Sequence, residues 1–236
     1  MFTDKIMPNI LHIETSTSVC SAALSSDGVV QCHFENFDGP SHASLLGAYV
    51  KELMTFARDK SIKVDAVAVS SGPGSYTGLR IGVSEAKGLC FGLKVPLIAV
   101  HTLELLACAT MFKTYFDEDV LYCPMIDARR MEVYTAVYDN ALNAVRPVQA
   151  CVVDENSFAD LLADRRVVFS GNGAAKCKEV IRHENAIFVD DIVSLATDML
   201  ALAERAYRQG QFEDVAYFEP FYLKEFIATT PKNKVL

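Results

Sequence analysis

The sequence predicts an α/β protein of two lobes with a mixed sheet in each lobe. Two observations lead to this fold class. A pattern of a strand, a hairpin and a helix-linked strand occurs twice along the 236 residues. Hydrophobic residues make up 51% of the chain, which supplies enough apolar surface for a core in each half. We expect an N-terminal lobe over residues 1–101 and a C-terminal lobe over residues 102–236, although the two halves show no clear internal sequence repeat.

The first lobe begins with three strands and a helix. Residues 9–15, 19–25 and 29–37 have the composition of strands, and Asp27-Gly28 between the last two is a hairpin signal. From Ser41 the apolar period becomes helical, which predicts a helix over residues 41–58. Its apolar arc is broad enough to touch two surfaces.

A buried strand and a glycine-rich loop follow. The apolar run at residues 64–70 leads into Gly72-Pro73-Gly74-Ser75, and Thr77 is expected to cap a helix that continues to about Leu93. Pro96 ends this region before a short strand at residues 97–100. A strand therefore runs through a tight loop into a helix.

The second lobe repeats the theme after a helix near residues 102–112. Strands are expected at residues 121–127, 132–138, 145–153 and 167–170, with the turn of the second hairpin at Asp139-Asn140. Helices are expected near residues 154–163 and 174–182 and over residues 192–208, the last of which is amphipathic and could pack back on the first lobe.

Charge and cysteine usage narrow the class of protein. The net charge of −8 argues against a protein that holds nucleic acid by itself, because phosphates must be neutralised by clustered Lys and Arg. The seven cysteines form no CxxC pair, so we expect reduced core thiols. No positively charged start followed by an apolar run appears at the N-terminus, and no uninterrupted apolar stretch approaches the roughly 20 residues that span a bilayer. We therefore expect a cytoplasmic protein without a membrane span.

Two loops are candidates for holding an anion or a nucleotide. The first follows the opening strand, and the second precedes a helix N-terminus, where unpaired amides favour an anion. An ordinary Ser/Thr turn explains the first loop more simply than anion binding, and close backbone packing explains the second loop equally well. Neither loop has the P-loop or dinucleotide-binding pattern. The candidate residues are Thr15, Ser16, Thr17, Gly72, Gly74 and Ser75.

The helix after the second loop carries two stripes of small residues. Gly78, Gly82 and Ala86 form one stripe, and Ser84, Gly88 and Gly92 form the other. A glycine inside a helix costs roughly 0.8 to 1 kcal/mol relative to alanine, so a compensating close contact is expected. One stripe could face the sheet and the other a partner helix, or both could pack within the chain.

Metal and nucleophile motifs are weak. The five histidines include no pair at i,i+3 or i,i+4, so no helix offers a two-histidine metal site. His42 beside Ser41 could be a base next to a nucleophile, but a capping role for Ser41 explains the pair more simply. The segment at residues 127–134 places two arginines and two carboxylates at a turn, a cluster suited to ion pairs or carboxylate recognition.

Taken together, three segments resemble the TsaB (YeaZ) family of tRNA threonylcarbamoyladenosine (t6A) biosynthesis proteins, which is related to TsaD and to glycoprotease-like proteins. They are Ile13-Glu14-Thr15-Ser16, the loop and helix start at residues 71–82, and the turn at residues 127–134. Residues 220–224 are similar to the closing segment of that family. The resemblance implies a two-lobed actin/Hsp70-like fold of the ASKHA, ribonuclease H-like type.

The resemblance also implies a role. TsaD-like relatives carry a His-x-x-x-His metal pair in a segment where this chain has Thr102 and Leu106, so transfer chemistry should be absent here. The implied role is a non-catalytic scaffold that binds and activates a TsaD-type subunit, with a TsaE-type ATPase joining and tRNA reached only through the complex. No metal or cofactor is expected, apart from weak nucleotide binding within the complex. The expected partner-interface residues are Leu45, Tyr49, Gly78, Gly82 and Ala86.

Other functions remain open at this point. The two loops would suit an ASKHA-type phosphotransferase that binds ATP. A glycoprotease-like hydrolase using His42 or Ser75 is a third hypothesis. The surface expected to bind a TsaD-type partner could also form a homodimer when the chain is alone.

Overall fold

The first lobe is built on a five-stranded mixed sheet, seen in a computed structural model that describes residues 7–39 and 41–224. β1 (Ile10–Glu14), β2 (Cys20–Ser26) and β3 (Val29–Asn36) form an antiparallel meander, and β4 (Ala66–Gly72) and β5 (Leu97–His101) add in parallel. The order is β3-β2-β1-β4-β5. The turn predicted at Asp27-Gly28 is confirmed, with positive φ at both residues, as a tight hairpin requires.

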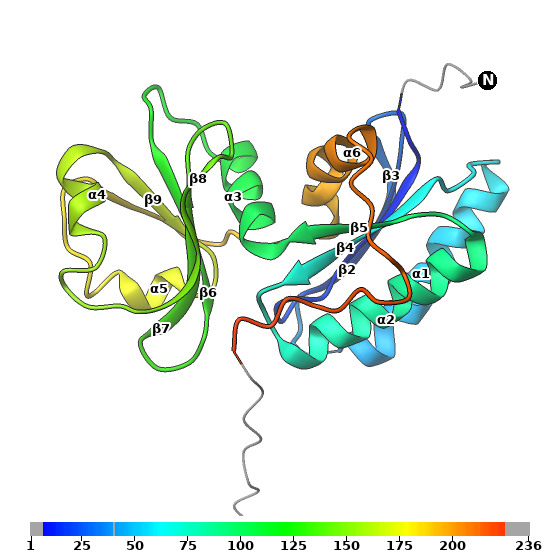
Figure 1. Cartoon of the computed structure of the whole chain (residues 1–236), viewed down its shortest axis with the longest axis horizontal. Coiled ribbons are helices and arrows are strands. Elements are labelled where there is room, and N and C mark those ends of the chain that lie inside the picture. Colours follow the sequence, from blue (N-terminus) through cyan, green and yellow to red (C-terminus); the bar gives the residue numbers. More distant parts are fainter. Residues whose placement is uncertain (1–6, 40, 225–236) are drawn as a thin grey trace, which may run out of the picture.

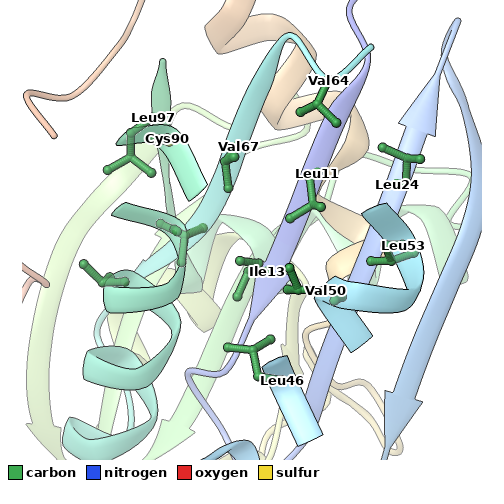
Figure 2. Close-up of a cluster of buried hydrophobic side chains, with 14 of the residues drawn as sticks. Leu11, Ile13, Leu24, Leu46, Val50, Leu53, Val64, Val67, Cys90 and Leu97 are labelled. Atoms are coloured by element: carbon green, nitrogen blue, oxygen red, sulfur yellow. The ribbon is translucent and has the colours of Figure 1, made fainter. Parts of the chain in front are cut away.

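Two long helices cover one face of this sheet. α1 (His42–Asp59) buries a stripe at helical spacing, and Leu46, Val50 and Leu53 from this stripe meet Leu11 and Ile13 of β1 (Figure 2). α2 (Tyr76–Leu93) lies beside α1 on the same face (Figure 1). Burial of each large aliphatic side chain contributes roughly 2 kcal/mol, so this core fixes both helices on the sheet.

The opposite face of the first sheet is covered by a late segment of the chain. A 3-10 helix, η1 (Ala196–Met199), leads into α6 (Leu200–Arg208), which packs on β5 and β1. The helix predicted over residues 192–208 is therefore too long. The Ala196 amide donates to the Ser21 hydroxyl of β2 at 2.9 Å, which holds the preceding residues against the sheet in a non-helical conformation.

The second lobe has the same topology. β6 (Leu121–Asp127), β7 (Glu132–Tyr138), β8 (Ala144–Val152), β9 (Val167–Ser170) and β10 (Ala186–Val189) form a sheet of order β10-β9-β6-β7-β8. β6, β7 and β8 are antiparallel, and β9 and β10 add in parallel. The predicted α/β class with a mixed sheet in each lobe is confirmed.

Helices in the second lobe are shorter than predicted. α4 (Ala159–Asp164) and α5 (Ala174–Cys177) replace the helices expected near residues 154–163 and 174–182. α3 (Thr102–Lys113) lies between the sheets: Leu105 packs with the first lobe and Leu106 with the second. All seven cysteines are unpaired.

A C-terminal strap, residues 211–224, runs back across the first lobe (Figure 1). The Glu213 amide donates to the Leu97 carbonyl on β5, and Lys87 of α2 donates to the carbonyls of Ala216 and Phe218. The strap then passes the N-terminal end of α2 and reaches the second lobe, where Lys224 pairs with Glu132.

Candidate functional site: a loop junction and an open helix face

The two loops singled out in the sequence meet at one edge of the first sheet. β1 and β4 are parallel neighbours, so the loops that follow them leave the sheet at the same edge. The Ser75 amide donates to the Ser16 carbonyl at 2.7 Å, and the Thr15 hydroxyl donates to the Gly78 carbonyl at 2.8 Å. The structure thus brings the six candidate residues together, but the loops contact each other directly.

The glycines in this junction allow that contact. A Cβ at Gly74 would overlap the Ser16 carbonyl, and a Cβ at Gly78 would overlap the Thr15 carbonyl. Gly72 has φ +107°, a backbone conformation that L side chains rarely adopt, and its Cβ position lies 2.5 Å from the Phe221 carbonyl of the strap. Close backbone packing therefore explains these glycines.

Ser75 caps α2. Its hydroxyl accepts from the Gly78 amide at 3.2 Å, and its backbone is extended, as an N-cap requires. The prediction that Thr77 is the cap is wrong, because the helix already begins at Tyr76. The Ser75 hydroxyl and amide are both used within the chain.

Glu14 holds the first loop from beneath. Its side chain is completely buried, and its Oε1 accepts from the Ser16 amide at 2.6 Å and from the Ser16 hydroxyl at 2.5 Å. Burial raises the pKa of Glu14 to about 7, although the two bonds from Ser16 oppose the rise. The sequence signal for this role is a carboxylate two residues before a hydroxyl at a strand end, which sequence reasoning did not use.

His42 fixes the same loop from the side. This residue is buried at the start of α1, and its Nε2 lies 2.8 Å from the Thr17 carbonyl. The Ser75 hydroxyl is engaged with Gly78. Among the described residues, His42 therefore forms no base–nucleophile pair with Ser75. The geometry favours a structural role for His42.

The first small stripe of α2 faces inward, which corrects its predicted place at a partner interface. Gly78, Gly82 and Ala86 are all buried, and a Cβ at Gly82 would overlap the Thr15 hydroxyl. These residues let α2 approach β1 and the first loop. They are covered by the chain itself and cannot touch a partner.

The second small stripe faces outward. A Cβ at Gly88 or Gly92 would meet no atom within 4 Å. The stripe borders a groove of about 280 Å³, whose lining residues are Ser84, Glu85, Gly88, Leu89, Gly92 and Leu93. Beside it, Phe91 is 84% exposed, which is unusual for so large an apolar side chain. The sequence identified this stripe but not its direction, and it did not identify Phe91.

Leu45 and Tyr49 lie on α1 at the edge of the first-lobe core. Both are half-buried, and the Tyr49 ring stacks on Phe34 of β3 at 5.3 Å between centroids. They therefore contribute part of their surface to the core and leave part open. A larger pocket of about 390 Å³ lies between β5 and α6, and the Glu104–Arg205 ion pair forms part of its lining.

Comparison with known proteins agrees with these features. Residues 39–232 match the family model described as TsaD, tRNA N6-adenosine threonylcarbamoyltransferase. The tRNA threonylcarbamoyladenosine biosynthesis protein TsaB of Escherichia coli is 31% identical over 230 residues, which cover 93% of this chain and 96% of that protein. The chain belongs to the TsaB family. The TsaB protein of Bacillus subtilis is 34% identical over 73% of this chain and 74% of its own length.

Solved structures related to TsaB confirm the fold. YeaZ from Pseudomonas aeruginosa matches with a TM-score of 0.74 at 28% identity, over 92% of this chain and all of that chain. A second Pseudomonas aeruginosa structure, described as similar to the peptidase YeaZ, has a TM-score of 0.78 at 26% identity over the same shares. The two lobes with strand order 3-2-1-4-5 are the actin/Hsp70-like arrangement expected for TsaB.

The two positions compared with the metal histidines of TsaD-like proteins lie in α3 of this TsaB chain. Thr102 and Leu106 are both buried. Among residues 7–39 and 41–224, no group of three or more His, Cys, Asp or Glu side chains is placed to hold a metal ion. Within the same part of the chain, no helix has the length and apolar character needed to cross a membrane.

Proposed function

We propose that this TsaB-family chain is a non-catalytic accessory subunit that binds and activates a TsaD-type catalytic subunit through the outer face of α1 and α2. The observation that carries the proposal is the outward stripe of Gly88 and Gly92 beside the exposed Phe91. Gly88 lies in the helix interior, where a glycine costs roughly 0.8 to 1 kcal/mol relative to alanine, and no contact within the described chain compensates for this cost. Close approach of a second helix would do so.

The shape of this face suits a helix as the partner element. Small residues along the groove let a facing backbone come near, and Phe91 and Leu93 supply exposed apolar surface at its rim. Leu45 and Tyr49 of α1 remain part of the proposed interface, whereas Ser84, Gly88 and Gly92 replace the buried stripe. In the absence of its partner the same face would support a homodimer.

The loop junction supports an accessory role more than catalysis or ATP binding. The amides and hydroxyls that would hold a phosphate are largely bonded within the chain, with carbonyl oxygens of the first loop turned toward the N-terminus of α2. We therefore propose that any nucleotide binds weakly and only within the complex, with a TsaE-type ATPase, and that tRNA is reached through the complex. Calorimetry of the isolated chain with ATP and magnesium should give no measurable heat of binding.

Co-purification with the cognate TsaD-type subunit tests the main proposal. Gly88→Leu fills the groove and should abolish association while the circular dichroism spectrum stays unchanged. Ala201→Leu adds an exposed leucine to α6 and should bind normally. Threonylcarbamoylation of tRNA by the remaining components should slow when this chain is omitted. Normal binding by Gly88→Leu, or full activity without the chain, would refute the proposal.

A further inference from the structure

The turn between β6 and β7 holds two arginines in an unfavourable backbone conformation. Arg129 has φ +72° and Arg130 has φ +48°, a region in which glycine or asparagine is the usual residue. Both arginines are exposed. Positive φ at two consecutive residues is common in the short turns that join antiparallel strands, and here the turn places both arginines at its tip.

The turn is fixed from both sides. The Asp127 amide donates to Asn172 Oδ1 at 3.0 Å, and the Arg129 amide donates to Asp127 Oδ1 at 3.0 Å. The Glu132 amide donates to the Arg129 carbonyl at 3.1 Å. The two arginines are therefore presented on an ordered backbone.

The neighbouring acids are neutralised by lysines from other elements. Asp127 pairs with Lys176 of α5, and Glu132 pairs with Lys224 of the strap. Among the described residues, neither Arg129 nor Arg130 has a side-chain hydrogen bond, an ion pair or a ring contact. The other eight arginines each contact an acid, a hydroxyl or an aromatic ring: Arg58, Arg80, Arg146, Arg165, Arg166, Arg182, Arg205 and Arg208.

The strap places this turn near the loop junction. The Phe221 amide donates to the Ser71 carbonyl, and Lys224 reaches Glu132 three residues later. Three extended residues span at most about 10 Å. Glu132, the residue that closes the turn, therefore lies on the side of the second lobe that the strap reaches.

We propose that Arg129 and Arg130 contact the phosphate backbone of RNA. Guanidinium groups bind phosphate oxygens in a bidentate manner, and an exposed turn suits an extended polyanion better than a small enclosed ligand. The turn is a local positive site on a chain of net charge −8, so it contributes to RNA binding only alongside a partner that supplies further cations. In this respect the inference rests on the proposed function.

The test measures tRNA affinity of the complex between this chain and its TsaD-type partner over a range of salt concentrations. The double variant Arg129→Gly with Arg130→Gly removes both charges and relieves the left-handed strain, so its melting temperature should be unchanged or higher. Its tRNA affinity should fall about tenfold near 0.1 M salt. The plot of log affinity against log salt has a negative slope, and the magnitude of that slope should be smaller by about 1 to 2.

A matched control removes the same charge from another adjacent pair. Arg165→Ala with Arg166→Ala alters two exposed arginines that already face Asp119 and Glu118. This control should bind tRNA normally. Free AMP at millimolar concentration should not displace tRNA. Displacement of tRNA by AMP would indicate a nucleotide site at the turn and would contradict the proposal.

Three further results would overturn the proposal. The first is unchanged tRNA affinity in the glycine variant, and the second is an equal loss of tRNA affinity in the control variant. The third is weaker association of the glycine variant with the TsaD-type subunit, which would mean that the turn binds an acidic protein surface. If no complex forms, the proposed function fails separately. Ultraviolet crosslinking of tRNA in a mixture of all components then decides the inference: crosslinks within residues 127–134 support it, and their absence contradicts it.

Discussion

The Ser75 amide donates a 2.7 Å hydrogen bond to the Ser16 carbonyl, so the cap of α2 is tied to the first loop of the protein. A carbonyl oxygen thus lies where an anion would otherwise meet the helix N-terminus. The position of α2, and with it the outward stripe, therefore depends on the turn that follows β1.

Loss of the cap should destabilise the lobe. Ser75→Ala removes the hydroxyl that accepts from the Gly78 amide and should cost about 1 kcal/mol of unfolding free energy. Thr77→Ala, two residues into the same helix, should change stability little, because Thr77 is exposed and not the cap. Urea unfolding of both variants measures the difference, and equal costs would contradict the assignment of the cap.

The two small stripes should respond oppositely to alanine. Gly82→Ala places a Cβ against the Thr15 hydroxyl and should destabilise the fold by about 1 to 3 kcal/mol. Gly88→Ala meets no atom and should stabilise the isolated chain by roughly 0.8 to 1 kcal/mol through helix propensity. Thermal unfolding of the two variants gives the sign directly, and a stabilised Gly82→Ala protein would place that stripe at the surface.

Buried groups on β1 should set the pH dependence of stability. Burial lowers the pKa of His12 to about 3 from 6.5 and raises that of Glu14 to about 7 from 4.5. Between pH 4.5 and 6.5 the unfolded chain binds a proton at the histidine, and the folded chain binds one at the glutamate. Their contributions to the slope of stability against pH therefore cancel in this window.

Glu14→Gln should reveal the histidine contribution. The amide oxygen can still accept from Ser16, but the proton held by the folded glutamic acid is gone. Stability should then rise with pH by about 1.4 kcal/mol per unit between pH 4.5 and 6.5, and at pH 8 the variant should exceed the wild type by on the order of 3 kcal/mol. Urea unfolding at several pH values measures both effects. Parallel curves for the two proteins would mean that Glu14 titrates normally.

The strap should open when its aromatic contact is removed. Tyr222 packs against the Tyr76 ring at 4.8 Å between centroids, an interaction worth about 0.5 to 1.5 kcal/mol beyond the buried area. Tyr222→Ala should accelerate hydrogen exchange of the Phe221 amide, which donates to Ser71. Tyr217→Ala changes a tyrosine of the same strap that is 84% exposed and should leave that exchange rate unchanged.

Local patterns in the sequence determined the described strands except β10 (Ala186–Val189), which was not predicted. They also determined the hairpin at Asp27-Gly28, both long helices of the first lobe and the family segments that mark a TsaB protein. These features depend on neighbours within a few residues, through turn chemistry and apolar period. Only the tertiary structure decided which stripe of α2 faces outward, because Gly82 and Gly88 are equivalent until β1 and Thr15 are placed against one of them. Tertiary structure also decided where the helix before Leu200 is shortened, because Ser21 from a distant strand holds Ala196. It likewise decided that Arg129 and Arg130 are unpaired among the described residues, because lysines far away in the chain neutralise the neighbouring acids.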